Sequence, residues 1–221
     1  MTYQRERELI CRLGRQMWQR GWVASNDGNL SLRVAPDRYL VTPTGVSKGF
    51  MEPDMLLVVD GTGQVVEPGA RGASSELPLH LMCYAARPDV GGVCHAHPPA
   101  ATAFACARLP LDAPILGETL MTLGTVPVAP YARTGTQALP EAVRPLLARH
   151  NGVLLANHGA LTVGETLEKA YDRMESLEHT AQIHLNVRLL GGGVPLDEEQ
   201  AGPLAGEKRK SPGKNPGAVM F

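Results

Sequence analysis

The first 21 residues carry apolar side chains at helical spacing. Leu9, Ile10, Leu13 and Met17 recur three or four positions apart, while charged and amide residues occupy most of the positions between them. A one-sided apolar stripe of this kind is typical of an amphipathic helix that covers a hydrophobic layer. Gly21 follows the stripe, and glycine is common just after the end of a helix. We expect a helix here that packs on a sheet.

Between about residues 29 and 67, short apolar runs alternate with turn-forming residues. The runs NLSLRV and RYLVT are separated by Ala35-Pro36-Asp37, and MLLVVDGTGQVVE contains two runs separated by Asp60-Gly61-Thr62-Gly63. Apolar runs of this length around a tight turn are typical of β-hairpins. The sequence therefore predicts two hairpins in succession.

The pattern after residue 74 changes to alternating strand-like and helix-like segments. The strands are predicted in DVGGVCHAH, TVPVAPYA and GVLLANHG, and the helices at about residues 76–87, 99–108, 136–150 and 167–190. Hairpins followed by strand–helix alternation indicate one mixed α/β layered domain, which we assign to residues 1–193. This pattern leaves the order of the strands open.

The segment after Gly193 has a different composition. It is rich in proline, glycine and charge and shows little periodicity. This composition is typical of a mobile tail, and it fits equally well an arm that a partner orders. We therefore predict a separate C-terminal tail over residues 194–221 and leave its role open.

Composition excludes several classes of protein. With 43% apolar and 19% charged residues, a chain of 221 residues can bury the core of a single domain. The net charge of -1, without a basic stripe, argues against nucleic acid as a partner. No apolar run is long enough to cross a membrane, and the charged start does not resemble a signal peptide, so we expect a cytoplasmic protein. The four cysteines form no C-x-x-C pair, which favours reduced, buried thiols.

Three histidines form a candidate metal site. His95 and His97 are two positions apart on a predicted strand, so their side chains project from one face, and Pro98 ends that strand. His158 ends another apolar strand, and we expect Gly159 to free the backbone to turn its imidazole toward the first pair. Three ligands and one open position are typical of catalytic zinc, whereas hydrogen-bonded packing is the alternative for an isolated H-x-H pair. No role is assigned to the histidines that lack a partner at ligand spacing, which are His80, His150, His179 and His184.

Glu76 follows two serines at the start of a predicted helix, where the helix dipole stabilises negative charge. A base beside a metal is what deprotonation next to a carbonyl group requires. The alternative is an ordinary glutamate in a first helical turn. Two glycine-containing loops, residues 26–29 and 42–45, could offer backbone N–H groups and hydroxyls to a phosphate, or could be plain turns.

Six short motifs occur in a characteristic order: GNLS near residue 28, TPTG at 42–45, SSE at 74–76, HAH at 95–97, APY at 129–131 and NHG at 157–159. Together they resemble the class II aldolase and adducin family over about residues 5–190. The resemblance implies a single three-layer αβα domain with a central mixed, largely antiparallel sheet. It also implies a homotetramer with zinc in active sites near the subunit interfaces.

The resemblance also assigns roles to residues. His95, His97 and His158 match the family's zinc ligands, and Glu76 matches its acid/base. The positions that match its phosphate site are Asn29, Thr44, Gly45, Ser74 and Ser75, to which Lys48 could add a cation. The implied reaction is the reversible cleavage of a ketose 1-phosphate, similar to L-fuculose 1-phosphate, into dihydroxyacetone phosphate and an aldehyde through a zinc-stabilised enediolate.

Two departures from the fuculose aldolase pattern leave the substrate open. Residues 114–118 lack the tyrosine which that enzyme presents from a neighbouring subunit to the aldehyde oxygen. Asp27 stands where that enzyme has a small neutral residue, and its carboxylate would repel a phosphate unless it points away. Alternatives within the family are a sugar-phosphate epimerase, a 3-oxo-tetronate-phosphate decarboxylase and a methylthioribulose-phosphate dehydratase. A scaffold similar to adducin, without catalysis, is a further alternative, and three imidazoles also accept divalent metals other than zinc.

Overall fold

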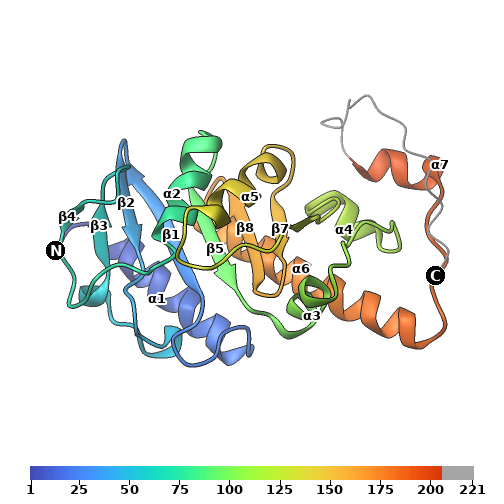
Figure 1. Cartoon of the computed structure of the whole chain (residues 1–221), viewed down its shortest axis with the longest axis horizontal. Coiled ribbons are helices and arrows are strands. Elements are labelled where there is room, and N and C mark those ends of the chain that lie inside the picture. Colours follow the sequence, from blue (N-terminus) through green and yellow to red (C-terminus); the bar gives the residue numbers. More distant parts are fainter. Residues whose placement is uncertain (206–221) are drawn as a thin grey trace.

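The computed structural model describes residues 1–205, and its centre is one mixed sheet of eight strands (Figure 1). The strand order is β4-β3-β2-β1-β5-β8-β7-β6. All neighbours pair antiparallel except β6 and β7, which are parallel, so the predicted mixed and largely antiparallel sheet is confirmed. The strands are β1 (Asn29–Ala35), β2 (Arg38–Val41), β3 (Leu57–Val59), β4 (Val65–Glu67), β5 (Gly92–Ala96), β6 (Val128–Ala129), β7 (Gly152–Leu155) and β8 (Gly159–Gly164).

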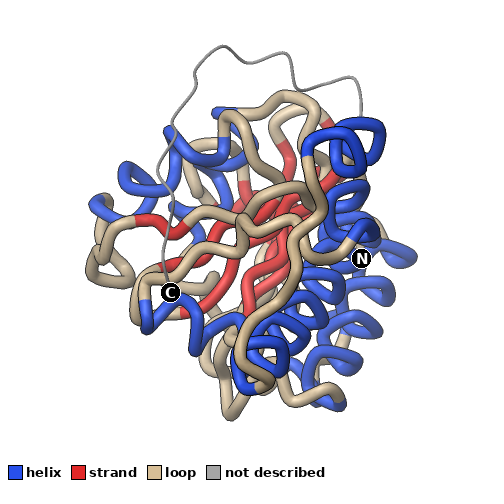
Figure 2. Tube along the Cα trace, turned by 90° about the vertical axis from the view of Figure 1, so that its right-hand side faces the viewer, coloured by secondary structure: helices blue, strands red, loops and turns tan. Residues whose placement is uncertain are grey.

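Helices lie on both sides of the sheet (Figure 2). They are α1 (Gln4–Gln19), α2 (Leu77–Ala86), α3 (Pro99–Ala107), α4 (Gly117–Thr122), α5 (Ala138–Leu147), α6 (Leu167–Leu189) and α7 (Glu198–Ala201). Three short 3-10 helices are η1 (Lys48–Phe50), η2 (Pro53–Met55) and η3 (Gly202–Ala205). One hydrophobic cluster joins α1, α3 and α6 to one face of the sheet, and a second joins α2 and α5 to the other face. The predicted three-layer αβα arrangement is therefore confirmed.

Alternation along the central strands supplies both clusters. On β5, Val93 packs in the cluster with α2 and α5, whereas Cys94 packs in the cluster with α1, α3 and α6. The same alternation on β8 separates Leu161 from Ala160. Because successive side chains of a strand point to opposite faces, a strand buried on both sides is apolar at most positions, and the buried polar exceptions here are His95 on β5 and Thr162 on β8. Burial of the apolar side chains thereby determines which face of the sheet each residue of β5 and β8 points to.

Several elements differ from their predictions. The predicted strand at 125–132 is reduced to the two residues of β6, and α4 was not predicted. Strand β8 was missed, because its residues are buried on both faces and show no alternation of apolar and polar side chains. Of the four cysteines, none forms a disulfide, but Cys106 is exposed, contrary to the prediction that all are buried.

The C-terminal segment is described only in part. Residues 194–205 contain α7 and η3, and α7 begins with a capping box between Asp197 and Gln200. The rest of the predicted tail, residues 206–221, lies outside the described residues, so the domain boundary at residue 193 stays a prediction. Over residues 1–205, no helix combines the length and the apolar character needed to cross a membrane.

Candidate active site

Three histidines meet at one end of strands β5, β7 and β8. His95 is the fourth residue of β5, His97 follows the end of that strand, and His158 lies in the turn between β7 and β8. The ring centroids of His95 and His158 are 4.7 Å apart, and those of His97 and His158 are 4.9 Å apart. One nitrogen from each ring lies within 4.8 Å of the other two. The structure thus brings together the three side chains that the sequence singled out.

The turn that directs His158 toward the other two histidines is made by Asn157 and not, as expected, by Gly159. Asn157 adopts the left-handed conformation that turns the chain, with φ of 56°, whereas Gly159 is the first residue of β8. A Cβ at residue 159 would lie 2.5 Å from the carbonyl oxygen of Ala96 and 2.5 Å from Cδ2 of His97. Gly159 is therefore needed for the close approach of the two strands and not for the turn.

The partners of Nδ1 determine the tautomers of His95 and His97. Nδ1 of His95 lies 2.8 Å from the carbonyl oxygen of Ala160, and Nδ1 of His97 lies 3.4 Å from the carboxylate of Asp27. Because a carbonyl and a carboxylate only accept, each Nδ1 carries a hydrogen and the neutral ring has its lone pair on Nε2. The two Nε2 atoms are 3.2 Å apart. Two lone pairs at this distance repel each other unless a positive charge lies between them.

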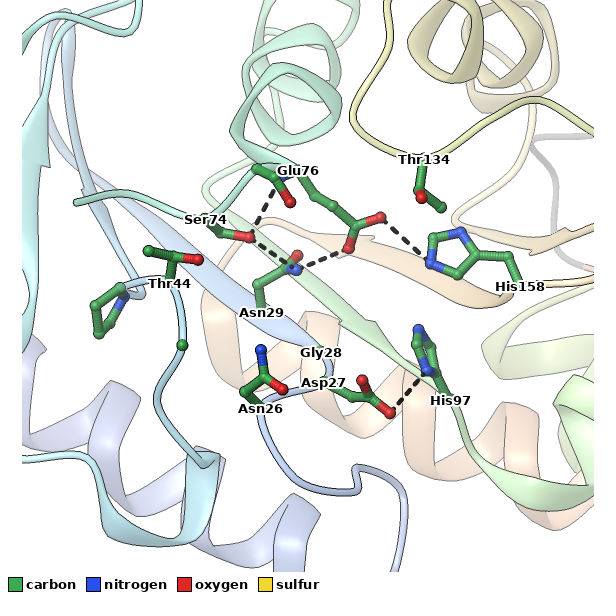
Figure 3. A pocket seen from close by; sticks show the side chains of 13 residues that line it. Asn26, Asp27, Gly28, Asn29, Thr44, Ser74, Glu76, His97, Thr134 and His158 are labelled. Carbon is green, nitrogen blue, oxygen red and sulfur yellow. Dashed lines mark hydrogen bonds and ion pairs between the residues drawn. The ribbon is translucent and has the colours of Figure 1, made fainter. Parts of the chain in front are cut away.

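Glu76 adds negative charge to the same point. It is the residue just before α2, and its Oε2 lies 3.0 Å from Nε2 of His95 (Figure 3 shows the carboxylate). Oε1 lies 3.2 Å from Nε2 of His158, but it is buried and forms no hydrogen bond within residues 1–205. Imidazole and carboxylate acceptors that converge in this way are the donor set that a divalent cation binds. The residues present therefore fit a metal ion.

The ionisation states of Glu76, His97 and His158 agree with this fit. Burial lowers the pKa of His95, but the neighbouring Glu76 carboxylate outweighs it and raises the pKa overall. Burial, together with the charge of His95, lowers the pKa of His97 and lowers that of His158 to about 3. Burial by itself raises the pKa of Glu76, yet His95 and the amide of Asn29 more than reverse this, and the net shift is downward. Glu76 is thus ionised and His97 and His158 are neutral, as metal binding requires, whereas His95 must give up the proton that Glu76 favours before its Nε2 can act as a ligand.

A cavity of about 290 Å³ opens beside the histidines. Its walls come from the loop before β1, the loop after β2, the segment before α2 and the two partly buried histidines His97 and His158 (Figure 3). All five predicted phosphate positions line it, namely Asn29, Thr44, Gly45, Ser74 and Ser75. Backbone hydrogen bonds from Thr44 N to Gly72 O and from Ser74 N to Thr42 O hold two of these loops together. The cavity therefore presents hydroxyls and an amide a short distance from the metal-binding side chains.

The sequence left open how two charged residues near the cavity are directed, and the structure answers this for both. The Asp27 carboxylate points toward His97, so its charge is directed at the histidines (Figure 3). Lys48, which could have supplied a cation to the phosphate, is 1% exposed, and its Nζ donates to the carbonyl oxygens of Asn26 and Val46. Burial lowers its pKa to about 8. Lys48 therefore joins the two loops from behind and does not line the cavity.

Sequence reasoning missed two residues of this region. Thr134 lies in the loop after β6 and lines the cavity, and no motif or periodicity singled it out. His80, to which we assigned no role, is hydrogen-bonded to Asn29 in the cavity wall. Its signal was its position four residues after Glu76, which places both side chains on one side of α2.

Comparisons with known proteins show which family the chain belongs to. Residues 8–185 match the model of the class II aldolase and adducin N-terminal domain. The chain therefore belongs to the class II aldolase and adducin family, as predicted. It is 34% identical over 192 residues to the 3-oxo-tetronate 4-phosphate decarboxylase of Haemophilus influenzae, covering 85% of this chain and 90% of the relative.

Aldolases of the family are similarly related. The chain is 32% identical over 190 residues to the L-fuculose phosphate aldolase of Escherichia coli, with 84% of this chain and 86% of the relative covered. A solved structure of an L-fuculose 1-phosphate aldolase superposes with a TM-score of 0.86 at 31% identity and covers 93% of this chain and 96% of the other. The chain is thus similar both to a decarboxylase and to aldolases that act on sugar phosphates.

Proposed function

We propose that this chain is a metal-dependent carbon–carbon lyase that releases dihydroxyacetone phosphate by decarboxylating a 3-oxo-tetronate 4-phosphate. The observation that carries the proposal is the convergence of three histidines and Glu76 at the wall of a cavity lined by hydroxyls and an amide. Loss of carbon dioxide from this substrate leaves the enediolate of dihydroxyacetone phosphate. The site must therefore hold a phosphate, stabilise negative charge on oxygen and deliver one proton to carbon.

In this proposal His95, His97 and His158 hold a divalent metal ion. A set of three imidazoles favours zinc and also accepts other divalent ions. Such an ion supplies a Lewis acid that draws negative charge onto the substrate's oxygen atoms. Asp27 and the carbonyl of Ala160 keep the histidine tautomers in which Nε2 is available.

Glu76 carries the proton. When the bond between carbon 1 and carbon 2 breaks, carbon dioxide leaves and the electron pair stays on the substrate as the enediolate. Carbon 2 then takes a proton, which Glu76 has collected from water on one carboxylate oxygen. The amide of Asn29, 2.9 Å from Oε2, keeps the carboxylate turned toward the histidines. Ser74, Ser75 and Thr44 bind the phosphate in this proposal.

Two observations favour decarboxylation over aldol cleavage. The first is the identity of 34–35% to decarboxylases of the family. The second is the absence of a tyrosine from residues 114–118. An aldehyde oxygen gains or loses a proton in an aldol reaction and benefits from an acid nearby, whereas carbon dioxide leaves without one.

Aldol cleavage of a ketose 1-phosphate is the second candidate. The close superposition with an L-fuculose 1-phosphate aldolase supports it, and both reactions pass through the same enediolate. Purified protein loaded with zinc should therefore be incubated separately with 3-oxo-tetronate 4-phosphate and with L-fuculose 1-phosphate, and the release of dihydroxyacetone phosphate and carbon dioxide measured. Release of both products from the first substrate alone supports decarboxylation. Release of dihydroxyacetone phosphate from the second substrate alone overturns it in favour of the aldolase.

Both candidate reactions include proton transfer between Glu76 and dihydroxyacetone phosphate. This step tests the site without the full substrate. In deuterated water, the loaded protein should exchange a hydroxymethyl proton of dihydroxyacetone phosphate, because Glu76 can remove and return it. If neither exchange nor turnover occurs in protein with full metal content, the proposed lyase activity is wrong.

We also propose the homotetramer that the family resemblance implies. Large apolar side chains near the end of α6 are exposed in the single chain, with Leu189 at 78% and Leu190 at 85%. A protein–protein contact would remove such side chains from water. Sedimentation equilibrium measures the mass, and a monomer at micromolar concentration would contradict the proposal.

A further inference from the structure

A continuous chain of buried hydrogen bonds runs from Glu76 into the layer between the sheet and α2. Asn29 Nδ2 donates to Glu76 Oε2 at 2.9 Å, and Oδ1 of the same amide contacts Nε2 of His80. Nδ1 of His80 lies 2.6 Å from Oγ of Ser31, which lies 2.7 Å from the hydroxyl of Tyr84. The four residues beyond Glu76 are each at most 4% exposed.

The residues of this hydrogen-bond chain come from β1 and from α2 with the residue that precedes it. Asn29 and Ser31 are two positions apart on β1, so their side chains project from one face of the sheet. Glu76, the residue just before α2, and His80 and Tyr84 within it are spaced by four residues, so they follow one side of the helix. Packing of α2 on β1 therefore interleaves the two sets.

The ionised carboxylate at one end sets the direction of every hydrogen bond. A carboxylate only accepts, so the NH₂ group of Asn29 must face Glu76 and its oxygen must face His80. Nε2 of His80 then carries the hydrogen, and Nδ1 accepts from the hydroxyl of Ser31. The hydroxyl of Ser31 in turn accepts from Tyr84. One arrangement of protons satisfies all of these groups.

The surroundings keep both titratable members of the chain neutral. Burial lowers the pKa of His80 to about 3, with a further lowering by His95 and an opposing effect of Glu76. Burial raises the pKa of Tyr84 far above its ordinary value. A neutral His80 with a single N–H is what the directed chain requires.

We propose that His80 is a positioning residue which, through its Nε2–H donor, fixes the Asn29 amide and thereby holds the Glu76 carboxylate beside the three histidines. The inference rests on the proposed function for the role of Glu76. Asn29 faces the cavity as well as Glu76, and a side-chain amide can rotate by half a turn at little cost when nothing distinguishes its two ends. The Glu76 carboxylate and the N–H of His80 together distinguish them, because the reversed amide would place two acceptors against each other at Glu76 and two donors against each other at His80.

A purely structural role makes a different prediction. If His80 only fills space, replacing it lowers stability and leaves the turnover of folded protein unchanged. If it positions Glu76, turnover falls while the metal content stays full, since His80 is not one of the three converging histidines.

The experiment compares two substitutions in the full chain loaded with zinc. His80→Gln can place an amide N–H near the position of Nε2, and His80→Leu offers no donor. We expect His80→Leu to lower kcat by about 10- to 100-fold with little change in KM, and His80→Gln to recover most of the loss. His184→Leu is the matched control, because His184 is also buried but lies on α6 outside the network, and it should retain kcat. Wild-type kcat in folded His80→Leu overturns the proposal.

A measurement on the wild-type protein decides the direction of the chain without any substrate. Nitrogen-15 NMR of labelled histidine should show His80 with its hydrogen on Nε2 and a bare Nδ1 at neutral pH. A hydrogen on Nδ1, or on both nitrogen atoms, overturns the proposal even if both variants fail to fold. If the protein converts none of the sugar phosphates, the proposed function fails separately, and the NMR result still supports or overturns the hydrogen-bond chain.

Discussion

The carboxylate of Asp27 lies 3.4 Å from Nδ1 of His97, on the side of the ring away from His95. Asp27 lines the cavity and its side chain is 43% exposed, yet its carboxylate is directed at a histidine. A carboxylate in this place keeps the hydrogen on Nδ1 and makes Nε2 a better ligand.

Asp27→Asn should weaken metal binding. We expect the affinity to fall by about 10- to 100-fold, because the amide holds the imidazole less firmly and does not raise its basicity. Competition with a chromophoric chelator measures the change. Asp172→Asn on the exposed side of α6 is the matched control. Equal affinities for the two variants would show that Asp27 does not support the metal site.

His97→Ala should remove the metal. Only two imidazoles would remain, and two ligands hold zinc far less tightly than three. Elemental analysis after dialysis should find almost no metal in this variant and full occupancy in His179→Ala, which changes an exposed histidine of α6. Full zinc content in His97→Ala would refute its assignment as a ligand.

Glu76→Gln should separate metal binding from chemistry. The histidines remain, so the metal content should stay full, but the amide cannot carry a proton. General acid–base groups contribute about 10²- to 10⁴-fold, and we expect a loss of that size in turnover and in proton exchange. Glu168→Gln, at an exposed position of α6, should behave as the wild type. Exchange at the wild-type rate in Glu76→Gln would assign the proton transfer to another group.

Gly159→Ala should disturb both the fold and the site. The added methyl group would lie 2.5 Å from the Ala96 carbonyl oxygen and from a ring atom of His97, so the strands must move apart. Overpacking of this kind costs about 1–3 kcal/mol, which thermal or urea unfolding measures. Gly202→Ala is the control, because no neighbouring atom of residues 1–205 lies within 4 Å of the added group. Unchanged stability and metal affinity in Gly159→Ala would contradict the close approach described for these strands.

Acid should destabilise the protein partly through His80. The folded state keeps this imidazole neutral down to a pKa of about 3, whereas the unfolded chain takes up the proton near the ordinary value of 6.5. Between these values the unfolded state binds more protons, so the free energy of unfolding falls as the pH falls, by at most about 1.4 kcal/mol per pH unit. Urea unfolding at several pH values should give a shallower dependence for His80→Gln. Equal slopes would show that His80 is protonated alike in both states.

The sequence predicts the parts of this structure that local patterns encode. Such patterns depend on residues close together in the sequence. They are the apolar stripes of α1 and α6, the turns of the two hairpins and the spacing of His95 and His97. Strand β8 escaped because burial on both faces removes alternation, and Gly159 was assigned to the turn because its close contact with His97 is a tertiary feature. The pairing of His80 with Asn29 joins residues 51 positions apart, and only the packing of α2 on β1 creates it. The cavity residues were recognised through the family's ordered motifs, since each loop by itself resembles an ordinary turn.

The register between β1 and β5 places Asn29 directly opposite His95. A slip of one residue along this pair would turn one of the two side chains to the opposite face of the sheet. Asn29, which contacts Glu76, therefore lies beside His95 only when β1 and β5, whose paired residues are more than 60 positions apart, have paired in the correct register. In the proposed metal-loaded protein, retention of the ion therefore reports on correct pairing of these two strands, and protein with slipped strands would be recognisable by its inability to retain metal.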